Sequence, residues 1–170
     1  MQRFTKIALA MSIAATFVAG NANAQTPSAS VRTERNISLA LANEIAGATV
    51  VACSANGYAV TATVVDRAGG VRAVQRADNA GSHTLAASQQ KAFTSASAKN
   101  TTLAMQDGSQ KNSAAANLVY IPGFLLLGGG VSIKVGNEVI GAVGVGGAPG
   151  GNLDEQCAMV ALDKVKDQLK

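Results

Sequence analysis

Apolar and polar positions along the chain predict three helices. From residue 37 to residue 55, apolar side chains recur at the three- and four-residue spacing of one helix face, at Ile37, Leu41, Ile45, Ala48 and Ala52. A second helix is predicted from Ser82 through Ala96, and it is dense in alanine, serine and threonine. A third, over residues 153–169, places on one face Ala158, Ala161, Leu162, Val165 and Leu169.

Strands are predicted in two groups between these helices. Residues 58–66 are rich in valine and threonine, residues 67–70 turn the chain, and residues 71–76 return as the second half of a hairpin. Residues 100–116 are polar and irregular, with a short helix expected around residues 103–106. Residues 118–127 are expected to enter a third strand, although Pro122-Gly123 interrupts them.

The return strand of the last predicted hairpin has no polar face. Residues 131–135 alternate with period two, Gly136-Asn137 suits a tight turn, and residues 138–145 return with apolar side chains on both parities. A ligand, a helix or a partner subunit must therefore cover the second side of the sheet.

A glycine-rich loop leads from this hairpin into the third helix. Asn152 is expected to cap that helix, with Glu155 in the capping-box position. The order of elements is helix, two strands, helix, irregular segment, about three strands, helix. It predicts an α+β domain: an antiparallel β-sheet of about five strands with the N- and C-terminal helices packed on one face.

The N-terminal segment is typical of a secretory signal. Arg3 and Lys6 precede an apolar run over residues 7–20, and Ala22-Asn23-Ala24 has the small residues of a cleavage site. A retained membrane anchor would need about 20 apolar residues, which this run does not reach. We expect residues 1–24 to be a signal peptide, residues 25–36 a flexible lead-in and residues 37–170 one domain, periplasmic or secreted and not inserted in a membrane.

Charge and aromatic content exclude one class of partner. Loss of Arg3 and Lys6 with the signal lowers the formal net charge from +4 to +2. Tryptophan is absent, and after the signal only Tyr58, Phe93, Tyr120 and Phe124 are aromatic. With so few stacking residues and no cluster of lysine and arginine, the chain is not expected to bind nucleic acid.

Two cysteines, Cys53 and Cys157, are the only ones in the chain. An even pair in an exported protein is first interpreted as a disulfide. Buried free thiols and a redox-active pair are the alternatives, although neither cysteine has a basic neighbour in sequence that would activate a thiolate.

Several segments together carry a family resemblance. They are residues 64–70 (VVDRAGG), 76–78 (RAD), 83–94 (HTLAASQQKAFT), 129–146 and 150–158 (GGNLDEQCA). In this order they resemble the GlcG/HbpS family of haem-binding, so-called haem-degrading, proteins, which is related to the C-terminal domain of PduO-type corrinoid adenosyltransferases. The resemblance implies a profilin-like domain, assembly into a homo-oligomer that is often an octamer, and haem as the cofactor of some members. With it, we expect neighbouring subunits to cover the second side of the sheet, with a flat apolar ligand beside them.

His83, the only histidine, is the candidate iron ligand, because neutral imidazole binds haem iron. The resemblance matches it together with Thr84 and Thr94. In the alternative interpretation the imidazole hydrogen-bonds the preceding loop or solvent. For the two threonines, local capping or backbone hydrogen bonds are the simpler expectation.

Lys91 and Arg76 are candidate partners of haem propionates, since both give charge-assisted hydrogen bonds to carboxylate. Alternatively, they pair with Asp78 and pin the loop to the helix. The glycines at the end of the sheet are candidates for an anion-binding nest beside the helix N-terminus, or they serve close packing and positive φ angles. These glycines are Gly146, Gly147, Gly150 and Gly151.

No pattern in the sequence supports catalysis. A Ser-His-Asp spacing, a Cys-His pair and a metal-ligand cluster are all missing, and Asp154 and Glu155 suit a helix N-terminus. The sequence therefore favours an exported haem-binding protein for haem capture, buffering or sensing. The alternative is an accessory or carrier module that binds a small carboxylate or phosphate at the glycine-rich loop.

Overall fold

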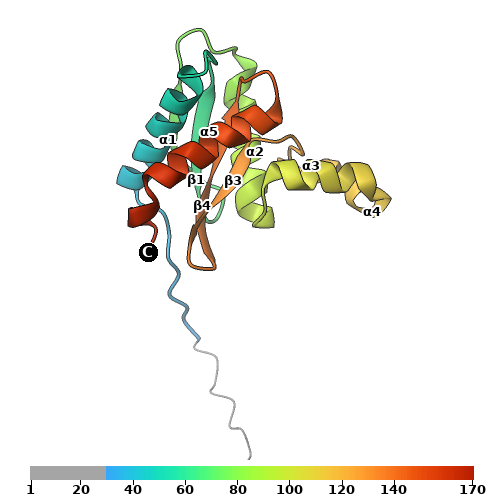
Figure 1. Cartoon of the computed structure of the whole chain (residues 1–170). Helices are drawn as coiled ribbons and strands as arrows, with labels where there is room; N and C mark the ends of the chain where they lie inside the picture. Colours follow the sequence, from blue (N-terminus) through green and yellow to red (C-terminus); the bar gives the residue numbers. More distant parts are fainter. Residues whose placement is uncertain (1–29) are drawn as a thin grey trace, which may run out of the picture. The chain divides into compact units, whose positions relative to one another are not determined.

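The computed structural model describes residues 30–170, of which Glu34–Lys170 form one compact unit. The predicted signal peptide and the first residues of the lead-in lie outside the described residues. The helices are α1 (Leu39–Ser54), α2 (His83–Ala98), α3 (Thr102–Lys111), α4 (Ser113–Ala116) and α5 (Gly151–Lys164), with short 3-10 helices at Asn117–Tyr120 and Lys166–Gln168. The strands are β1 (Thr61–Asp66), β2 (Val71–Arg76), β3 (Gly130–Val135) and β4 (Glu138–Gly146) (Figure 1).

The four strands form one antiparallel sheet in the order β2-β1-β4-β3. The α+β class is confirmed, with four strands where about five were expected. The missing strand is the one predicted over residues 118–127, which instead form a 3-10 turn and a loop. Gly123 adopts φ +85°, and the Phe124 N–H bonds back to the Ile121 carbonyl, so this segment turns where a strand would have to extend.

The sheet lies between two helical layers. Helices α1 and α5 pack together on one face, as predicted, and α2 packs on the other face across β1, β3 and β4. The expectation that neighbouring subunits and a ligand cover this second face is therefore wrong, because a helix of the chain itself covers it. The sequence left open whether a ligand, a helix or a partner subunit covers this face, and in the structure a helix covers it.

Helix α2 can lie close to the sheet because both surfaces carry small side chains. A Cβ on Gly144 of β4 would lie 2.0 Å from the Ser88 carbonyl oxygen. Paired hydroxyls join the two layers: Thr61 and Thr84 are 2.7 Å apart, as are Thr63 and Ser88. The buried polar groups of this layer are thus satisfied within the chain.

The opposite face holds the larger apolar core. Ile45 of α1, Val64 of β1 and Ile133 of β3 are fully buried there. The predicted disulfide is confirmed: Cys53 of α1 and Cys157 of α5 are bonded, with Cα atoms 5.3 Å apart. It closes a loop of 104 residues and is expected to stabilise the fold by about 3–5 kcal/mol.

Helix α5 begins differently from the prediction. Gly150 occupies the N-cap position, no side chain caps the helix, and Asn152 lies within its first turn. The proposed capping box of Asn152 and Glu155 is therefore wrong. Ser82 precedes α2 but makes no side-chain cap either.

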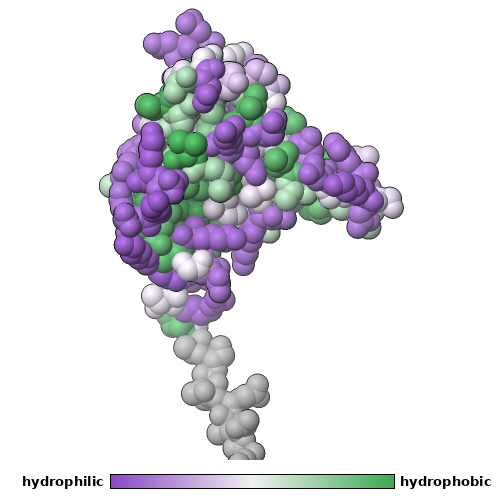
Figure 2. Space-filling view, viewed as in Figure 1, coloured by the Kyte–Doolittle hydropathy of each residue, from purple (hydrophilic) through white to green (hydrophobic). Residues whose placement is uncertain are grey.

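The end of the predicted lead-in belongs to the compact unit. Arg35 and Arg67 both pair with Glu138, at 2.7 and 2.8 Å, and the Ile37 N–H donates to the Ile140 carbonyl. Helices α3 and α4 extend away from the sheet as an arm whose surface is largely hydrophilic in Figure 2. Among residues 30–170, no helix is long and apolar enough to cross a membrane.

Candidate functional site

A cavity of about 240 Å³ lies where the N-terminal half of α2 meets the loop between β4 and α5. Of the nine residues that the sequence marked for cofactor binding, six line it: His83, Lys91, Gly146, Gly147, Gly150 and Gly151. Leu127 also lines the cavity and is 42% exposed, so it adds apolar surface at the cavity edge. The structure therefore gathers most of the predicted site in one place.

His83 is the first residue of α2 and is exposed at this cavity. Its ring lies against the backbone of Gly81, where an added Cβ would come 2.6 Å from the imidazole Cε1. Within residues 30–170 the imidazole has no hydrogen-bond or ion-pair partner. A nitrogen lone pair of this ring is thus available to a ligand.

Lys91 lies two turns further along α2 and is only 2% exposed. Its Nζ donates to the Val145 carbonyl at 2.9 Å and to Asp154 Oδ2 at 2.8 Å. The structure thus pairs Lys91 with a carboxylate on α5, and the loop residue considered in the sequence, Asp78, is not its partner. A buried ammonium group is tolerable because both contacts are charge-assisted or directed at a backbone carbonyl.

The Asp154 carboxylate occupies the position at the glycine loop where the sequence suggested a site for an external anion. Its Oδ1 accepts a hydrogen bond from the Ala148 N–H at 3.0 Å, and its Oδ2 contacts Lys91. Burial raises the pKa of the Asp154 carboxyl above its ordinary value, while the charge of Lys91 and the hydrogen bonds from Lys91, Ala148 and Gly147 oppose that rise. The glycine loop therefore directs its N–H groups at a carboxylate of the chain itself.

Two of the loop glycines are needed for packing and backbone conformation. Gly147 adopts φ +134°, and a Cβ there would lie 2.5 Å from the Ala59 carbonyl oxygen. Gly151 packs on Gly128, with its Cβ position 2.7 Å from the Gly128 oxygen. Of the two interpretations left open for these glycines, the structure supports close packing and positive φ.

The other three marked residues do not line the cavity. Thr84 donates to the Gly81 carbonyl at 2.6 Å, and Thr94 donates to the Gln90 carbonyl at 2.8 Å, so both hydroxyls bond to the backbone of their own segment. The Arg76 guanidinium donates to the Ala80 carbonyl. These contacts match the structural interpretations that the sequence offered for the threonines.

Sequence reasoning missed two residues of the site. Leu127 was assigned to a strand, and its position at the cavity depends on the loop that replaces that strand. Asp154 was interpreted only through its favourable place at a helix N-terminus. The usable signal was an acidic residue in the first helical turn directly after a glycine loop, which can turn back and accept the loop's N–H groups.

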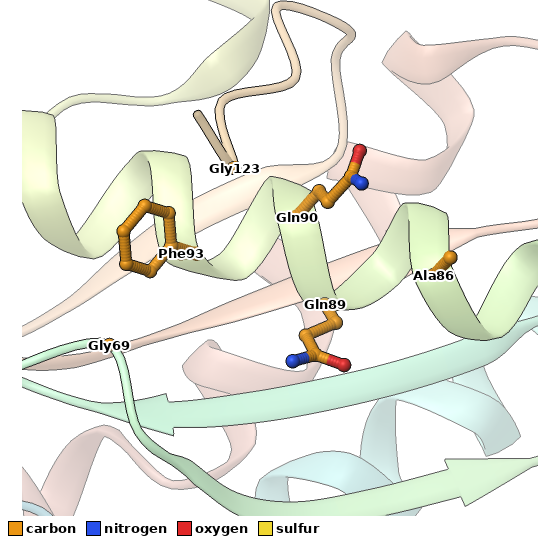
Figure 3. Close-up of a pocket in the computed structure, with 6 residues that line it drawn as sticks. All are labelled: Gly69, Ala86, Gln89, Gln90, Phe93 and Gly123. Atoms are coloured by element: carbon orange, nitrogen blue, oxygen red, sulfur yellow. The ribbon is translucent and has the colours of Figure 1, made fainter. Parts of the chain in front are cut away.

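A second cavity, of about 330 Å³, lies on the outer side of α2 (Figure 3). Phe93 forms one wall between Gly69 and Gly123, and the side chains of Gln89 and Gln90 point in opposite directions. Among the described residues, no ionisable side chain lines it. Elsewhere in residues 30–170, no three His, Cys, Asp or Glu side chains gather into a metal-binding group. The chemically equipped site is therefore the smaller cavity at His83.

The fold and this site define an α+β domain whose sheet is covered by helices on both faces, with a free imidazole and a buried ion pair at one end of it. Residues 37–163 match the family described as "Haem degrading protein HbpS-like". The chain belongs to this family, as the sequence resemblance indicated.

Solved structures of similar proteins agree with the assignment. The crystal structure of HbpS is 30% identical, with a TM-score of 0.75 over 83% of this chain and 98% of that chain. A double mutant of Streptomyces reticuli HbpS is also 30% identical, with a TM-score of 0.74 over 83% and 94%. The Klebsiella pneumoniae protein ORFY is 29% identical, with a TM-score of 0.76 over 81% and 96%.

A more distant structure is a complex with haem. The PduOC:heme complex is 20% identical, with a TM-score of 0.68 over 75% of this chain and 94% of that chain. At this identity the comparison shows a shared fold, and the haem is a property of that protein. No curated protein sequence matches the chain significantly.

Proposed function

We propose that this protein binds haem at the His83 cavity, with the imidazole as the iron ligand, and that it serves haem capture, buffering or sensing outside the cytoplasm. The observation that carries the proposal is the exposed imidazole without a partner in the described chain, set at a cavity in a member of the HbpS-like family. Bound haem would supply the iron, and the chain would ligate and orient it.

The residues present fit such a group. Ala87 and the loop glycines carry no large side chains, so a flat ring can approach the backbone, and Leu127 offers it an apolar edge. At about 240 Å³, the cavity is below the roughly 300–1,000 Å³ of pockets that enclose drug-sized ligands. It would hold one side of a haem and leave the rest at the open mouth.

A second copy of the chain is the proposed cover for that open side. Exposed apolar side chains near the α3–α4 arm support an oligomer: Val119, Tyr120 and Ile121 are 52%, 80% and 41% exposed. The disulfide supports an oxidising compartment, in keeping with the predicted signal peptide and export.

A hemin titration of the mature protein tests the proposal. We expect a shifted Soret band that saturates at one equivalent per chain, lost in His83→Ala and retained in Gln90→Ala, which alters only the second cavity. An unshifted band in the native protein would refute haem binding. A shift that survives in His83→Ala and disappears in Gln90→Ala would move the site to the other cavity.

The alternative, a carrier of small carboxylates or phosphates at the glycine loop, has less support. The Ala148 N–H that such an anion would need at the loop already bonds to the Asp154 carboxylate. A thermal-shift panel separates the two functions. Stabilisation by small organic acids or inorganic phosphate, but not by hemin, would favour the carrier.

A further inference from the structure

We infer that the ligand of the His83 cavity is a carboxylic acid, and that buried Lys91 binds its carboxylate while Asp154 holds the lysine in position. This inference rests on the proposed function and deepens it: for haem, the group that Lys91 binds is a propionate. It adds a second anchoring point to the one at His83.

The first support is the donor inventory of Lys91. An ammonium group has three N–H donors. The Val145 carbonyl and Asp154 Oδ2 take two of them, and no other acceptor in residues 30–170 takes the third. Since Lys91 lines the cavity, a ligand in the cavity can reach this remaining donor.

The second support is the presence of an ion pair at a place that packing alone would fill with apolar side chains. Lys91 and Asp154 are 2% and 3% exposed, and α2 packs here on a sheet of valine, alanine and glycine. Desolvation makes a buried pair no more stabilising than apolar residues of similar volume in many proteins. The pair therefore calls for a role other than stability, and a cavity wall is where a charge can have one.

The third support is the spacing along α2. His83, Ala87 and Lys91 stand at i, i+4 and i+8 and all line the cavity. At 1.5 Å per residue, His83 and Lys91 are separated by about 12 Å along the helix axis, with only the Ala87 methyl group between them. This row of three residues suits a flat ligand that presents a metal centre to His83 and a carboxylate on a flexible arm to Lys91.

A ligand carboxylate at Lys91 would lie close to the Asp154 carboxylate, so the protonation of Asp154 must respond to binding. Asp154 on α5 and His83 on α2 are the ionisable groups that line the cavity with it, while the glycine loop contributes none. Burial already raises the pKa of Asp154. A ligand carboxylate at Lys91 would raise it further, so binding is expected to take up protons and to strengthen as the pH falls toward that pKa.

The test compares hemin with hemin dimethyl ester, in which both propionates are uncharged. Native protein and the paired variant Lys91→Met/Asp154→Leu are titrated with each, and thermal unfolding verifies that the variant folds. We expect the native protein to prefer hemin by about 10- to 100-fold, the range of one hydrogen bond to a charged group. The paired variant should bind both compounds with the weaker affinity of the ester.

Each other outcome has a distinct meaning. Equal affinity of the native protein for hemin and its ester, or a preference that persists in the paired variant, overturns the role of Lys91 while haem binding stands. If neither compound shifts the Soret band of native protein, the proposed function fails, and this inference fails with it. Should the paired variant not fold, Lys91→Gln/Asp154→Asn takes its place in the same comparison.

Discussion

Lys91 of α2 and Asp154 of α5 form an ion pair of 2.8 Å that joins helices from opposite faces of the sheet. The contact is possible because Gly129 has no side chain: a Cβ there would lie 2.8 Å from the Asp154 Cβ and 3.1 Å from the Lys91 Nζ. One pair thereby ties the two helical layers together and forms the base of the candidate site.

Removing one partner of this pair is expected to be severe. Lys91→Met leaves the Asp154 carboxylate buried without its cation, which should lower the free energy of unfolding by about 3–5 kcal/mol. The paired variant Lys91→Met/Asp154→Leu should recover most of the loss, because no charge remains buried. Urea unfolding of both variants measures the difference, and a single variant as stable as the native protein would show that the pair is not desolvated.

Gly144 is predicted to tolerate no side chain. In Gly144→Ala the new methyl group would meet the Ser88 carbonyl oxygen and the Ala92 N–H, both backbone atoms of α2, so the helix must move away from the sheet. We expect a loss of about 1–3 kcal/mol or more in thermal or urea unfolding.

The matched control for that substitution is Gly108→Ala in α3. Nothing lies within 4 Å of the Cβ position at Gly108, and alanine favours the helix by about 1 kcal/mol. This variant should be neutral or stabilised. Equal effects of the two substitutions would contradict the close contact of α2 and β4.

The disulfide should contribute strongly to stability. Replacing both cysteines, as Cys53→Ala/Cys157→Ala, is expected to lower the free energy of unfolding by about 2–5 kcal/mol, since the unfolded chain then loses a cross-link over 104 residues. Reducing the native protein with dithiothreitol should give a similar loss, whereas the same reductant should leave the variant unchanged. A reductant-sensitive variant would be inconsistent with this prediction.

Acid is predicted to release the segment that precedes α1. Hydrogen bonds from Arg35, together with Arg67 and the charge of Arg35, lower the pKa of the Glu138 carboxyl below its ordinary 4.5. A lowered pKa in the folded state means that the contribution to stability is complete above about pH 4.5 and is lost as the pH falls through the lowered value.

Hydrogen exchange of the Ile37 amide, which bonds to the Ile140 carbonyl beside this ion pair, measures the release. Its protection relative to global stability should decrease below that pH in the native protein. In Glu138→Gln the protection should already be low and should depend little on pH. A pH dependence retained in this variant would assign the effect to another group.

Much of the fold could be predicted from local patterns. Period-two alternation and glycine turns located both hairpins, helical spacing located α1, α2 and α5, and the even pair of cysteines gave the disulfide. These features depend on neighbouring residues, or on chemistry that few residues share. The cavity at His83 also brings together residues that the family resemblance had marked.

Two features of the fold needed the tertiary structure. The strand expected over residues 118–127 does not form, because Gly123 adopts φ +85° and turns the chain. The sequence also did not decide what covers the second face of the sheet. The serines and threonines of α2 do not show in sequence which surface they meet, whereas in the fold Thr84 and Ser88 are buried and hydrogen-bonded to hydroxyls on β1.

The amino-acid sequence by itself determined the elements, the α+β class, the family and the residues worth testing, because periodicity, turn chemistry and motif order are local properties of the chain. Only the tertiary structure decided that the Asp154 carboxylate accepts hydrogen bonds from both the glycine loop and Lys91. It also decided that the His83 imidazole lies at a cavity without a partner in the described chain. Those facts depend on which of several competing acceptors comes within about 3 Å of a donor, and that is set by the packing of α2, β4 and α5 against one another.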